Sequence, residues 1–435
     1  MGCCSSKKPN RNAVDISHFV KLRAIGKGTC GAIVSSSSLG PTSSAGGFGL
    51  VHVVKKLTPP QAENDLFAMK TMAKQTLLQS EWHLSVAWLE RNVLRIVQSP
   101  FLPKLHWAFQ DRARLYLVMD FLPGGDLGFY VDKHHGLPEE SIVFYIAEIA
   151  LGIQALHDQY IVHHDIKPSN ILLDSSGHAR ITDFGLATIL DAESGFRTRL
   201  AGGTPGFMPP ESIMGKFHVF EPDFFALGST IYYCYKQRAP FVSNEQMMEQ
   251  KAIPHSWRLI PDVARNLIER LLKFDMNERL TDWDEFERHE FFRTIDWDQM
   301  RKCSGKGPIN IETTARNFPM EVCALDALVP DEAKPIKDQT VFDGFEYDED
   351  KGDASAMREA PGRIAEFAAR LSVERSGGGA SKSVGPISAS RSLPPRRPRA
   401  AQTVGFDRVA VTVLPAPTAG DNDTQIHPVL VQPKA

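Results

Sequence analysis

The chain has 435 residues, with 49 Lys and Arg against 52 Asp and Glu, so its formal net charge is −3. A sequence-independent nucleic-acid binder needs a strong basic excess to release counterions from phosphates, so this near balance argues against that class. Hydrophobic residues make up 42% and charged residues 23%, which excludes collagen-like and wholly disordered chains.

The amino-terminal residues carry no apolar segment of the kind found in secretory signals. Residues 1–8, Met-Gly-Cys-Cys-Ser-Ser-Lys-Lys, fit the pattern for N-myristoylation at Gly2 and palmitoylation at Cys3 and Cys4. One myristoyl chain binds membranes only marginally, with an association constant of order 10⁴ M⁻¹, so stable anchoring needs the second acyl signal. We therefore predict a lipid-anchor leader over residues 1–18. An unmodified, disordered leader is the alternative.

This leader predicts a protein on the cytoplasmic side of a membrane, most simply the plasma membrane, with a cytosolic pool. Two further observations agree with that compartment. The six cysteines are sparse and lack metal-ligand spacing, which is typical of a reducing environment. No stretch reaches the roughly 18 uninterrupted apolar residues of a membrane-spanning helix, so none is expected.

Dense apolar patterning extends over residues 19–295, interrupted by a stretch rich in Ser, Gly and Thr at 29–46. Apolar and β-branched runs predict strands, and apolar residues at helical spacing predict helices. The strands are expected at 19–25, 51–54, 66–72 and 115–121, and the helices at 141–157, 224–233 and 263–272. This order predicts an α+β fold with a small β-rich lobe and a larger helical lobe. The tail, 348–435, is rich in Gly, Ser and Pro and is predicted to be largely disordered.

Four motifs follow one another inside the patterned region. Gly26-Lys27-Gly28 opens a Gly-x-Gly-x-x-Gly spacing, in which glycines let backbone amides approach phosphates. Each motif alone has a plain structural explanation, because glycine clusters and single charges usually mark turns and solvent-facing positions. The other three motifs are Ala68-Met69-Lys70, residues 163–170 with the sequence His-His-Asp-Ile-Lys-Pro-Ser-Asn, and Asp183-Phe184-Gly185. In this order the motifs resemble the eukaryotic protein kinases over residues 19–295.

The resemblance implies a bilobal protein kinase fold that uses ATP and Mg²⁺ to phosphorylate protein substrates. Lys167 resembles the serine/threonine branch of the family. By residue-to-residue match the catalytic group is Asp165, Lys167, Lys70, Glu90 and Thr204, with Asn170 and Asp183 as metal ligands. The match assigns nucleotide contacts to Gly26, Gly28, Gly49, Val51, Ala68, Lys70, Asp120, Leu122, Asp126 and Leu172. No nucleic-acid partner is expected, and the protein is expected to be a monomer.

Two aromatic segments narrow the resemblance to the AGC group, with its YANK-like branch as one possibility. Residues 291–297, Phe-Phe-Arg-Thr-Ile-Asp-Trp, close the domain, and residues 342–347, Phe-Asp-Gly-Phe-Glu-Tyr, follow about fifty residues later. The resemblance implies that residues 296–347 form an AGC-type extension whose Phe342 and Phe345 fill a pocket of the small lobe. Glu346 stands where many AGC kinases carry a phosphorylated residue, so this docking is expected to need no phosphate. A loose aromatic-acidic tail is the alternative.

Three departures from the AGC pattern concern regulation and substrate choice. His164 stands where the family usually has the Arg that binds an activation-segment phosphate. Thr198 is the only nearby regulatory phospho-acceptor, and its spacing to Thr204 is longer than the AGC spacing. Ser169 and Tyr233 stand where AGC kinases that prefer basic substrates often place acidic residues, so that preference is not carried over.

The fourth departure is the stretch at 29–46. Removing it would join Gly28 to Gly47-Phe48-Gly49-Leu50-Val51, a better match to the glycine loop. An insertion in the loop, or an unspliced intron in the gene model, explains it, and a genuine insertion should weaken ATP binding. The leading interpretation is an active kinase, and the alternative is a catalytically impaired pseudokinase that acts as a membrane-anchored scaffold. A weaker hypothesis assigns an adaptor role to the Pro/Arg segment at 394–398, which lacks a full PxxP ligand.

Overall fold

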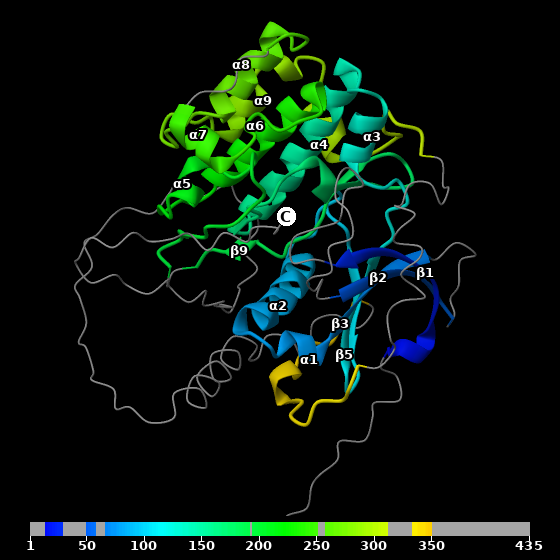
Figure 1. Ribbon diagram of the computed structural model, residues 1–435. Coiled ribbons are helices and arrows are strands. Elements are labelled where there is room, and N and C mark those ends of the chain that lie inside the picture. Colours follow the sequence, from blue (N-terminus) through cyan, green and yellow to red (C-terminus); the bar gives the residue numbers. More distant parts are fainter. Residues whose placement is uncertain are drawn as a thin grey trace, which may run out of the picture. The chain divides into compact units, whose positions relative to one another are not determined.

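The computed structural model describes residues 14–28, 49–57, 66–191, 194–250, 257–311 and 333–349. The chain separates into two compact units. The sheet unit contains the described residues up to 84, together with 104–121 and 333–349. The helical unit contains residues 85–103 and the described residues from 122 to 311 (Figure 1). The predicted division into a β-rich part and a larger helical part is confirmed. The predicted lipid sites and the tail from residue 350 onward lie outside the described residues.

The sheet unit is built on one six-stranded sheet with the strand order β1-β2-β3-β5-β4-β10, in which every neighbouring pair is antiparallel. The strands are β1 (Phe19–Gly28), β2 (Gly49–Lys56), β3 (Leu66–Ala73), β4 (Leu105–Gln110), β5 (Arg114–Asp120) and β10 (Tyr347–Asp348). The four strands predicted from sequence are present, each within a few residues of its expected bounds. The strands β4 and β10 had no predicted range.

Aromatic packing fills one part of the sheet unit's core. The Trp107 ring on β4 lies 5.7 Å from that of Phe19 on β1 and 5.2 Å from that of Phe67 on β3, and both contacts are tilted or edge-on. Phe19 also stacks on Phe109, and the same cluster contains Val54, Met69, Tyr116 and Val118. Such tilted and offset aromatic pairs add to the gain from apolar burial.

The pairing of β1 with β2 bears on the stretch at 29–46, which lies outside the described residues. Gly28 is paired with Gly49, and Gly26 with Val51. Without residues 29–46, the chain between Gly28 and Gly49 would consist of Gly47-Phe48 alone. Two-residue loops are the commonest hairpin connections, and those with Gly first suit the type II′ turn. The register of the strands therefore supports an insertion at 29–46 in an otherwise minimal glycine loop.

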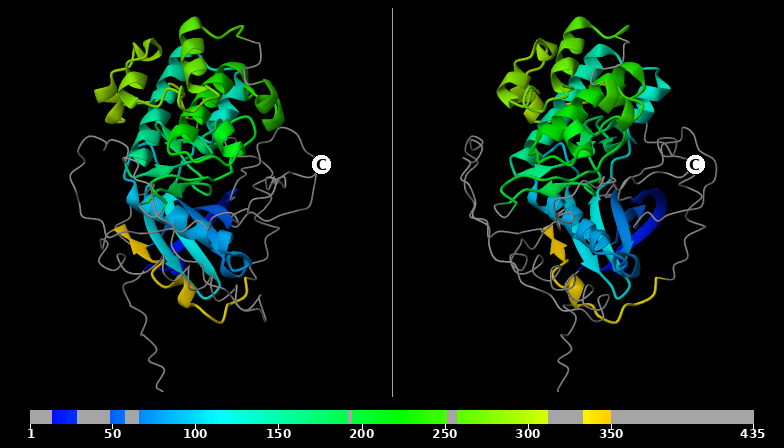
Figure 2. Two further views of the ribbon diagram at one scale, coloured as in Figure 1. Left: turned by 90° about the vertical axis from the view of Figure 1, so that its left-hand side faces the viewer. Right: turned by 60° about the vertical axis from the view of Figure 1, so that its left-hand side comes forward.

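The helical unit combines helices with two short β-ribbons (Figure 2). The ribbons pair β6 (Ile161–Val162) with β9 (Thr188–Ile189) and β7 (Ile171–Leu173) with β8 (Ala179–Ile181). The helices are α3 (Leu127–Lys133), α4 (Glu139–His157), α5 (Pro210–Ile213), α6 (Glu221–Lys236), α7 (Asn244–Gln250), α8 (Asp262–Leu271), α9 (Trp283–Glu287) and α10 (Trp297–Arg301). Two further helices precede them: α1 (Lys74–Leu77) lies in the sheet unit, and α2 (Glu81–Ile96) begins in the sheet unit and continues in the helical unit.

Helix α4 is the centre of the helical unit and agrees closely with the helix predicted at 141–157. An 18-residue stretch of this 19-residue helix has a mean hydropathy of 1.2, so by length and composition alone it could span a membrane. However, 78% of that stretch is buried inside the protein. Side chains are buried nearly all round the helix, as expected for a core helix of a large domain. We therefore assign α4 to the protein core.

Candidate active site

The loop between β6 and β7 carries a network of short hydrogen bonds centred on Asp165, which is almost fully buried. Thr204 donates its hydroxyl hydrogen to Oδ1 of Asp165 at 2.6 Å, and the Lys167 ammonium lies 2.7 Å from Oδ2. Lys167 also donates to the Thr204 hydroxyl at 2.6 Å. The Asn170 amide donates to the backbone carbonyl of Asp165 at 2.8 Å and to Oδ2 at 3.1 Å. Four of the residues predicted from sequence therefore meet in one cluster.

The charge of Asp165 is held by these partners. Burial opposes ionisation, but the Lys167 ammonium and the hydrogen bonds from Lys167 and Thr204 outweigh it, and the pKa of Asp165 lies below its usual value. The residue is therefore an anion near neutral pH. A carboxylate with fixed lone-pair directions can accept a hydrogen bond from an incoming hydroxyl and orient it.

Asp223 on α6 fixes the backbone on which this network is built. Its two carboxylate oxygens accept hydrogen bonds from the amides of His163 at 2.9 Å and His164 at 2.8 Å. The His157 ring lies 2.8 Å from the same carboxylate. Burial opposes the charge of Asp223, yet the bond to His157 and the neighbouring imidazoles lower its pKa to about 2. Because His164 adopts a positive φ of 66°, these anchoring bonds hold a backbone conformation that is unfavourable for a non-glycine residue.

The two predicted metal ligands sit on neighbouring parts of the helical unit. Asn170 ends the 3₁₀ turn Pro168–Asn170, and its backbone carbonyl oxygen accepts hydrogen bonds from the Thr182 amide at 2.9 Å and the Thr182 hydroxyl at 3.0 Å. Asp183 follows Thr182 directly, with a left-handed φ of 63°. The next ring, Phe184, packs edge-on against His163 at 5.4 Å. Carboxylate and amide oxygens are the ligands that Mg²⁺ prefers, so the residues present fit this ion.

The predicted nucleotide contacts divide between the two units. Gly26, Gly28, Gly49, Val51, Ala68, Lys70 and Asp120 belong to the sheet unit, and Leu122, Asp126 and Leu172 belong to the helical unit, as does the catalytic Glu90. Within the sheet, Lys70 lies at the centre of β3, paired with Val51 on β2 and Leu117 on β5. The side chains of Lys70 and Glu90 are both buried. Gly49 needs to be glycine, because an added Cβ would lie 2.6 Å from the Thr71 carbonyl oxygen.

Asp126 has a structural task in addition to its predicted contact. Its side chain accepts a hydrogen bond from the Phe129 amide at 2.9 Å and thereby caps α3. Its backbone forms an isolated β-bridge with Leu172, so two of the predicted contacts lie side by side in the helical unit. Burial raises the pKa of Asp126 to about 6. Its assignment to the nucleotide stays a prediction.

A buried ion pair fastens α5, which follows the activation segment around Thr198 and Thr204, to the rest of the helical unit. Glu211 on α5 and Arg279 are both almost fully buried, and Nη2 of Arg279 lies 2.9 Å from Oε2 of Glu211. The guanidinium also donates to the backbone carbonyls of Glu221 and Lys273. Several acceptors thus satisfy one cation, which is what a buried charge requires.

His164 stands at the position where the family usually has a phosphate-binding Arg. His164 is buried, neither of its ring nitrogens has a hydrogen-bond partner among the described residues, and burial lowers its pKa to about 3. Its ring lies edge-on to that of His218 at 5.4 Å. The backbone of His218 forms a two-way bridge with Thr198, whose hydroxyl accepts a hydrogen bond from the Leu200 amide. A regulatory role for Thr198 stays a prediction, and nothing in the sequence pointed to His218.

The carboxyl-terminal extension is anchored in the sheet unit. Phe342 and Phe345 are fully buried. The Lys74 ammonium, at the start of α1, lies 4.9 Å from the centre of the Phe342 ring and donates to Gln339 Oε1 at 2.5 Å. Gln110 on β4 donates to the Phe342 carbonyl and to the Glu346 carboxylate, both at 2.7 Å. Figure 1 shows this segment, in yellow, beside α1.

Two of these anchors, Lys74 and Gln110, were missed by sequence reasoning because each is a single polar residue beside an apolar strand. Burial lowers the pKa of Lys74 to about 8. Beyond the aromatic pair, β10 extends the sheet along β4, and Glu349 lies 2.8 Å from His106 and 2.7 Å from Lys104. Residues 333–349 are therefore packed against the sheet unit and do not form a loose tail.

Comparison with known proteins gives a consistent answer. Residues 43–292, more than half of the chain, match the family model described as "Protein kinase domain". The chain is 34% identical over 302 residues to ribosomal protein S6 kinase 2 beta of Xenopus laevis, a match that covers 67% of this chain and 44% of that protein. It is 29% identical over 361 residues to the RAC family serine/threonine-protein kinase homolog of Dictyostelium discoideum, covering 78% and 74%. It is 33% identical over 310 residues to human ribosomal protein S6 kinase alpha-1, covering 69% and 39%. The chain thus spans about two fifths of the length of both S6 kinases.

Proposed function

Because the chain belongs to the protein kinase family, within the AGC group of serine/threonine kinases, we propose that it is an active phosphotransferase. Its substrates would be serine or threonine hydroxyls of proteins, and its phosphate donor ATP. The observation that carries this proposal is the closed network of Asp165, Lys167, Asn170 and Thr204, in which the side chains that would handle the substrate hydroxyl are already oriented.

The roles follow from the geometry of this network. Asp165, held as an anion, would accept the hydrogen of the substrate hydroxyl and direct its oxygen for in-line attack. Lys167 is held 2.7 Å from that carboxylate and so places a positive charge where the transferred phosphoryl group develops negative charge. Thr204 links both side chains, so the position of the activation segment is coupled directly to the catalytic base. Asn170 and Asp183 would hold Mg²⁺, which supplies charge neutralisation at the phosphates when bound.

A pseudokinase scaffold is the second candidate function. It is favoured by the stretch at 29–46, which would interrupt the loop that covers the phosphates, and by His164, which gives no cation for a regulatory phosphate. The intact residues Lys70, Glu90 and Asp183 favour catalysis instead. The two functions are separated by the Asp165 experiment described in the Discussion.

We also propose that the protein is tethered to the cytosolic face of a membrane through acylation of Gly2, Cys3 and Cys4. The support for this is the sequence pattern alone, since these residues lie outside the described part of the chain. Myristate without a second signal binds only marginally, which is why the two cysteines belong to the proposal.

Changing Gly2 to Ala removes the glycine amino group that myristate would acylate, and we expect most of the protein to move from the membrane to the soluble fraction. Fractionation of cells that express full-length Gly2→Ala, followed by quantification of both fractions, measures this. Asn10→Ala, which leaves the acylation pattern intact, serves as the control. Retention of Gly2→Ala on membranes at the wild-type level would contradict the lipid anchor.

We further propose that docking of the extension supports activity without phosphorylation. Phe342 and Phe345 are buried in the sheet unit, and Lys74 contacts the Phe342 ring. Lys74 is the first residue of α1, and the chain continues from α1 into α2, the helix that carries Glu90. Glu346, which stands where many AGC kinases carry a phosphorylated residue, accepts a hydrogen bond from Gln110 without any phosphate. Docking would therefore favour a position of α2, and so of Glu90, that supports catalysis.

Phe345→Ala is expected to lower the rate of phosphate transfer about tenfold or more. Truncating a buried Phe removes about 3–5 kcal/mol of packing, and every 1.4 kcal/mol changes the docked population about tenfold. Steady-state phosphorylation of a generic protein substrate measures the rate. Glu346→Gln keeps a side-chain oxygen that can accept from Gln110 and should stay near wild type. Unchanged activity of Phe345→Ala would contradict the role of docking.

A further inference from the structure

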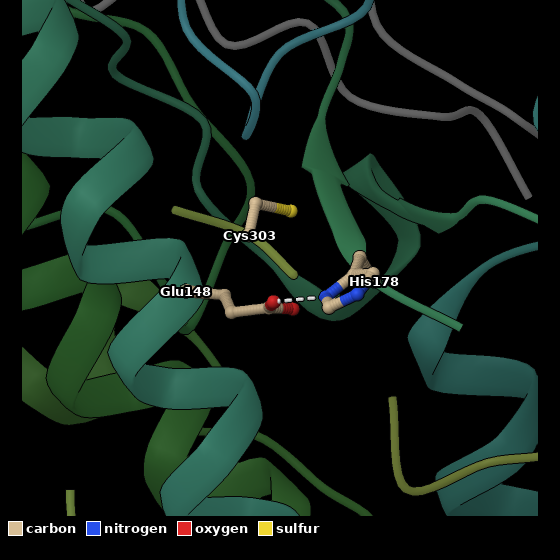
Figure 3. A group of neighbouring side chains, drawn as sticks. All are labelled: Glu148, His178 and Cys303. Atoms are coloured by element: carbon tan, nitrogen blue, oxygen red, sulfur yellow. Dashed lines mark hydrogen bonds and ion pairs between the residues drawn. The ribbon is translucent and has the colours of Figure 1, made fainter. Parts of the chain in front are cut away.

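Three side chains of different chemistry converge in the helical unit, away from the catalytic loop. Glu148 comes from the middle of α4, His178 precedes β8, and Cys303 follows α10 (Figure 3). One ligand atom from each residue lies within 4.8 Å of the other two. Glu148 and His178 are buried, and Cys303 is half-buried. Three segments that are far apart in the sequence thus bring a carboxylate, an imidazole and a thiol together.

The surroundings already orient two of these three groups. Oε2 of Glu148 accepts a hydrogen bond from the Ala179 amide at 2.8 Å, and Oε1 lies 2.6 Å from Nδ1 of His178. The other ring nitrogen of His178 lies 3.4 Å from the Gly305 carbonyl oxygen. The contacts with Ala179 and Gly305 come from outside the three residues and are of the kind that fixes ligands in metal sites, whereas the short contact joins two of the ligands themselves.

We propose that Glu148, His178 and Cys303 bind a divalent transition-metal ion, Zn²⁺, with a fourth position left for water. The donor set decides the ion: thiolate and imidazole favour Zn²⁺, whereas Mg²⁺ and Ca²⁺ prefer oxygen alone. Zn²⁺ with ligand distances of about 2.0–2.3 Å and tetrahedral angles places its donors roughly 3.3–3.6 Å apart. Around the ion, Oε1 of Glu148 and Nδ1 of His178, now 2.6 Å apart, would therefore separate by about 0.7 Å, and the Cys303 thiol would move to about 3.5 Å from them. Coordination would release the proton between Glu148 and His178, and the thiol proton of Cys303, to solvent.

The position of the cluster gives this ion a structural task. The segment after α10 crosses the turn between β7 and β8, where the Gly307 amide donates to the Ser176 carbonyl at 2.8 Å. The Ile309 amide donates to the Tyr145 hydroxyl on α4 at 3.3 Å. The ion would add a third tie between this segment, the core helix and the β7–β8 ribbon. Asp183, the predicted Mg²⁺ ligand, follows His178 by five residues. The bound ion would therefore restrict the motion of the backbone that carries Asp183.

The test uses the full chain, stripped of metal by a chelator and titrated with Zn²⁺ alone and, separately, with Co²⁺ alone. We expect a Cys303-dependent site with a stoichiometry of one, and a thiolate-to-cobalt charge-transfer absorption that only a sulfur ligand produces. Zn²⁺ should also raise the melting temperature. Cys303→Ser should abolish the charge-transfer band and weaken Zn²⁺ binding at least about tenfold, since even loss of a supporting residue costs about 10–100-fold.

Three further variants make the result specific. Cys234→Ala removes a buried thiol on α6, outside the cluster, and should leave the band unchanged. The double variant Cys3→Ser/Cys4→Ser removes the two thiols of the leader and should also leave it unchanged. Cys303→His restores a nitrogen ligand and should recover Zn²⁺ binding without the band. Absence of Co²⁺ charge transfer in the wild-type chain, or a band that survives Cys303→Ser, would overturn the site.

Discussion

Replacing Asp165 by Asn reduces phosphate transfer by about 10²–10⁴-fold, the range for loss of a positioned acid–base group, while nucleotide binding persists. Asn has the shape of Asp, so it can still accept a hydrogen bond from the Thr204 hydroxyl. It has lost the negative charge that pairs with Lys167 at 2.7 Å and that receives the hydrogen of the incoming hydroxyl. Transfer of radiolabelled phosphate from ATP to a generic protein substrate measures the change, with bound nucleotide measured in parallel.

The matched control is Asp298→Asn, because Asp298 is 93% exposed and lies on the short helix α10. It should retain wild-type activity. Two outcomes would speak against the proposed enzyme. If the wild-type chain transfers no phosphate although it binds nucleotide, the scaffold function gains the support. If Asp165→Asn retains wild-type transfer, the measured activity does not arise from this site.

Arg279→Ala destabilises the helical unit by about 3–5 kcal/mol, because it leaves the carboxylate of Glu211 buried without its counter-charge. The side chain of Arg279 is fully buried, and that of Glu211 is 2% exposed. Two backbone carbonyls, those of Glu221 and Lys273, lose their donor at the same time. Urea unfolding followed by far-ultraviolet circular dichroism measures the change in the free energy of unfolding.

The control for this prediction is Arg265→Ala, which removes the same type of side chain from an exposed pair. Arg265 and Glu269 lie one turn apart on α8, and both side chains are well exposed. Exposed helical pairs of this kind contribute about 0.3–0.5 kcal/mol. A loss for Arg279→Ala as small as that for Arg265→Ala would show that the buried pair does not hold the activation segment to the helical unit.

The catalytic residues could be predicted because their chemistry forces them into short, ordered motifs. Asp165, Lys167 and Asn170 lie within one short loop, and Asp183 follows soon after, so the motifs and their order identified them. Their long-range partner Thr204 followed from the family pattern, and its hydrogen bonds with Asp165 and Lys167 are present. Strand and helix positions in the apolar region were also predictable, since burial of one face imposes a period on the sequence.

Other contacts could not be predicted, because nothing in the local sequence distinguishes the residues that make them. Gln110 and Lys74 receive a segment from a distant part of the chain, and either could have been a solvent-facing polar residue. His218 is paired with Thr198 by backbone bonds that any residue could form. The convergence of Glu148, His178 and Cys303 likewise depends on the path of the chain after α10 and on no motif.

The pairing of β10 with β4 has a consequence for the fate of shortened forms of this protein. A strand at the border of a sheet presents a row of unused amides and carbonyls, which can recruit the same strand from another molecule. Here Tyr347 and Asp348 pair with Ala108 and Trp107 and occupy part of that row on β4. A chain cut before residue 333 would leave the backbone groups of Trp107 and Ala108 on β4 without these partners. We therefore expect a shortened chain to self-associate more readily than the full chain, independently of whether any phosphate is transferred.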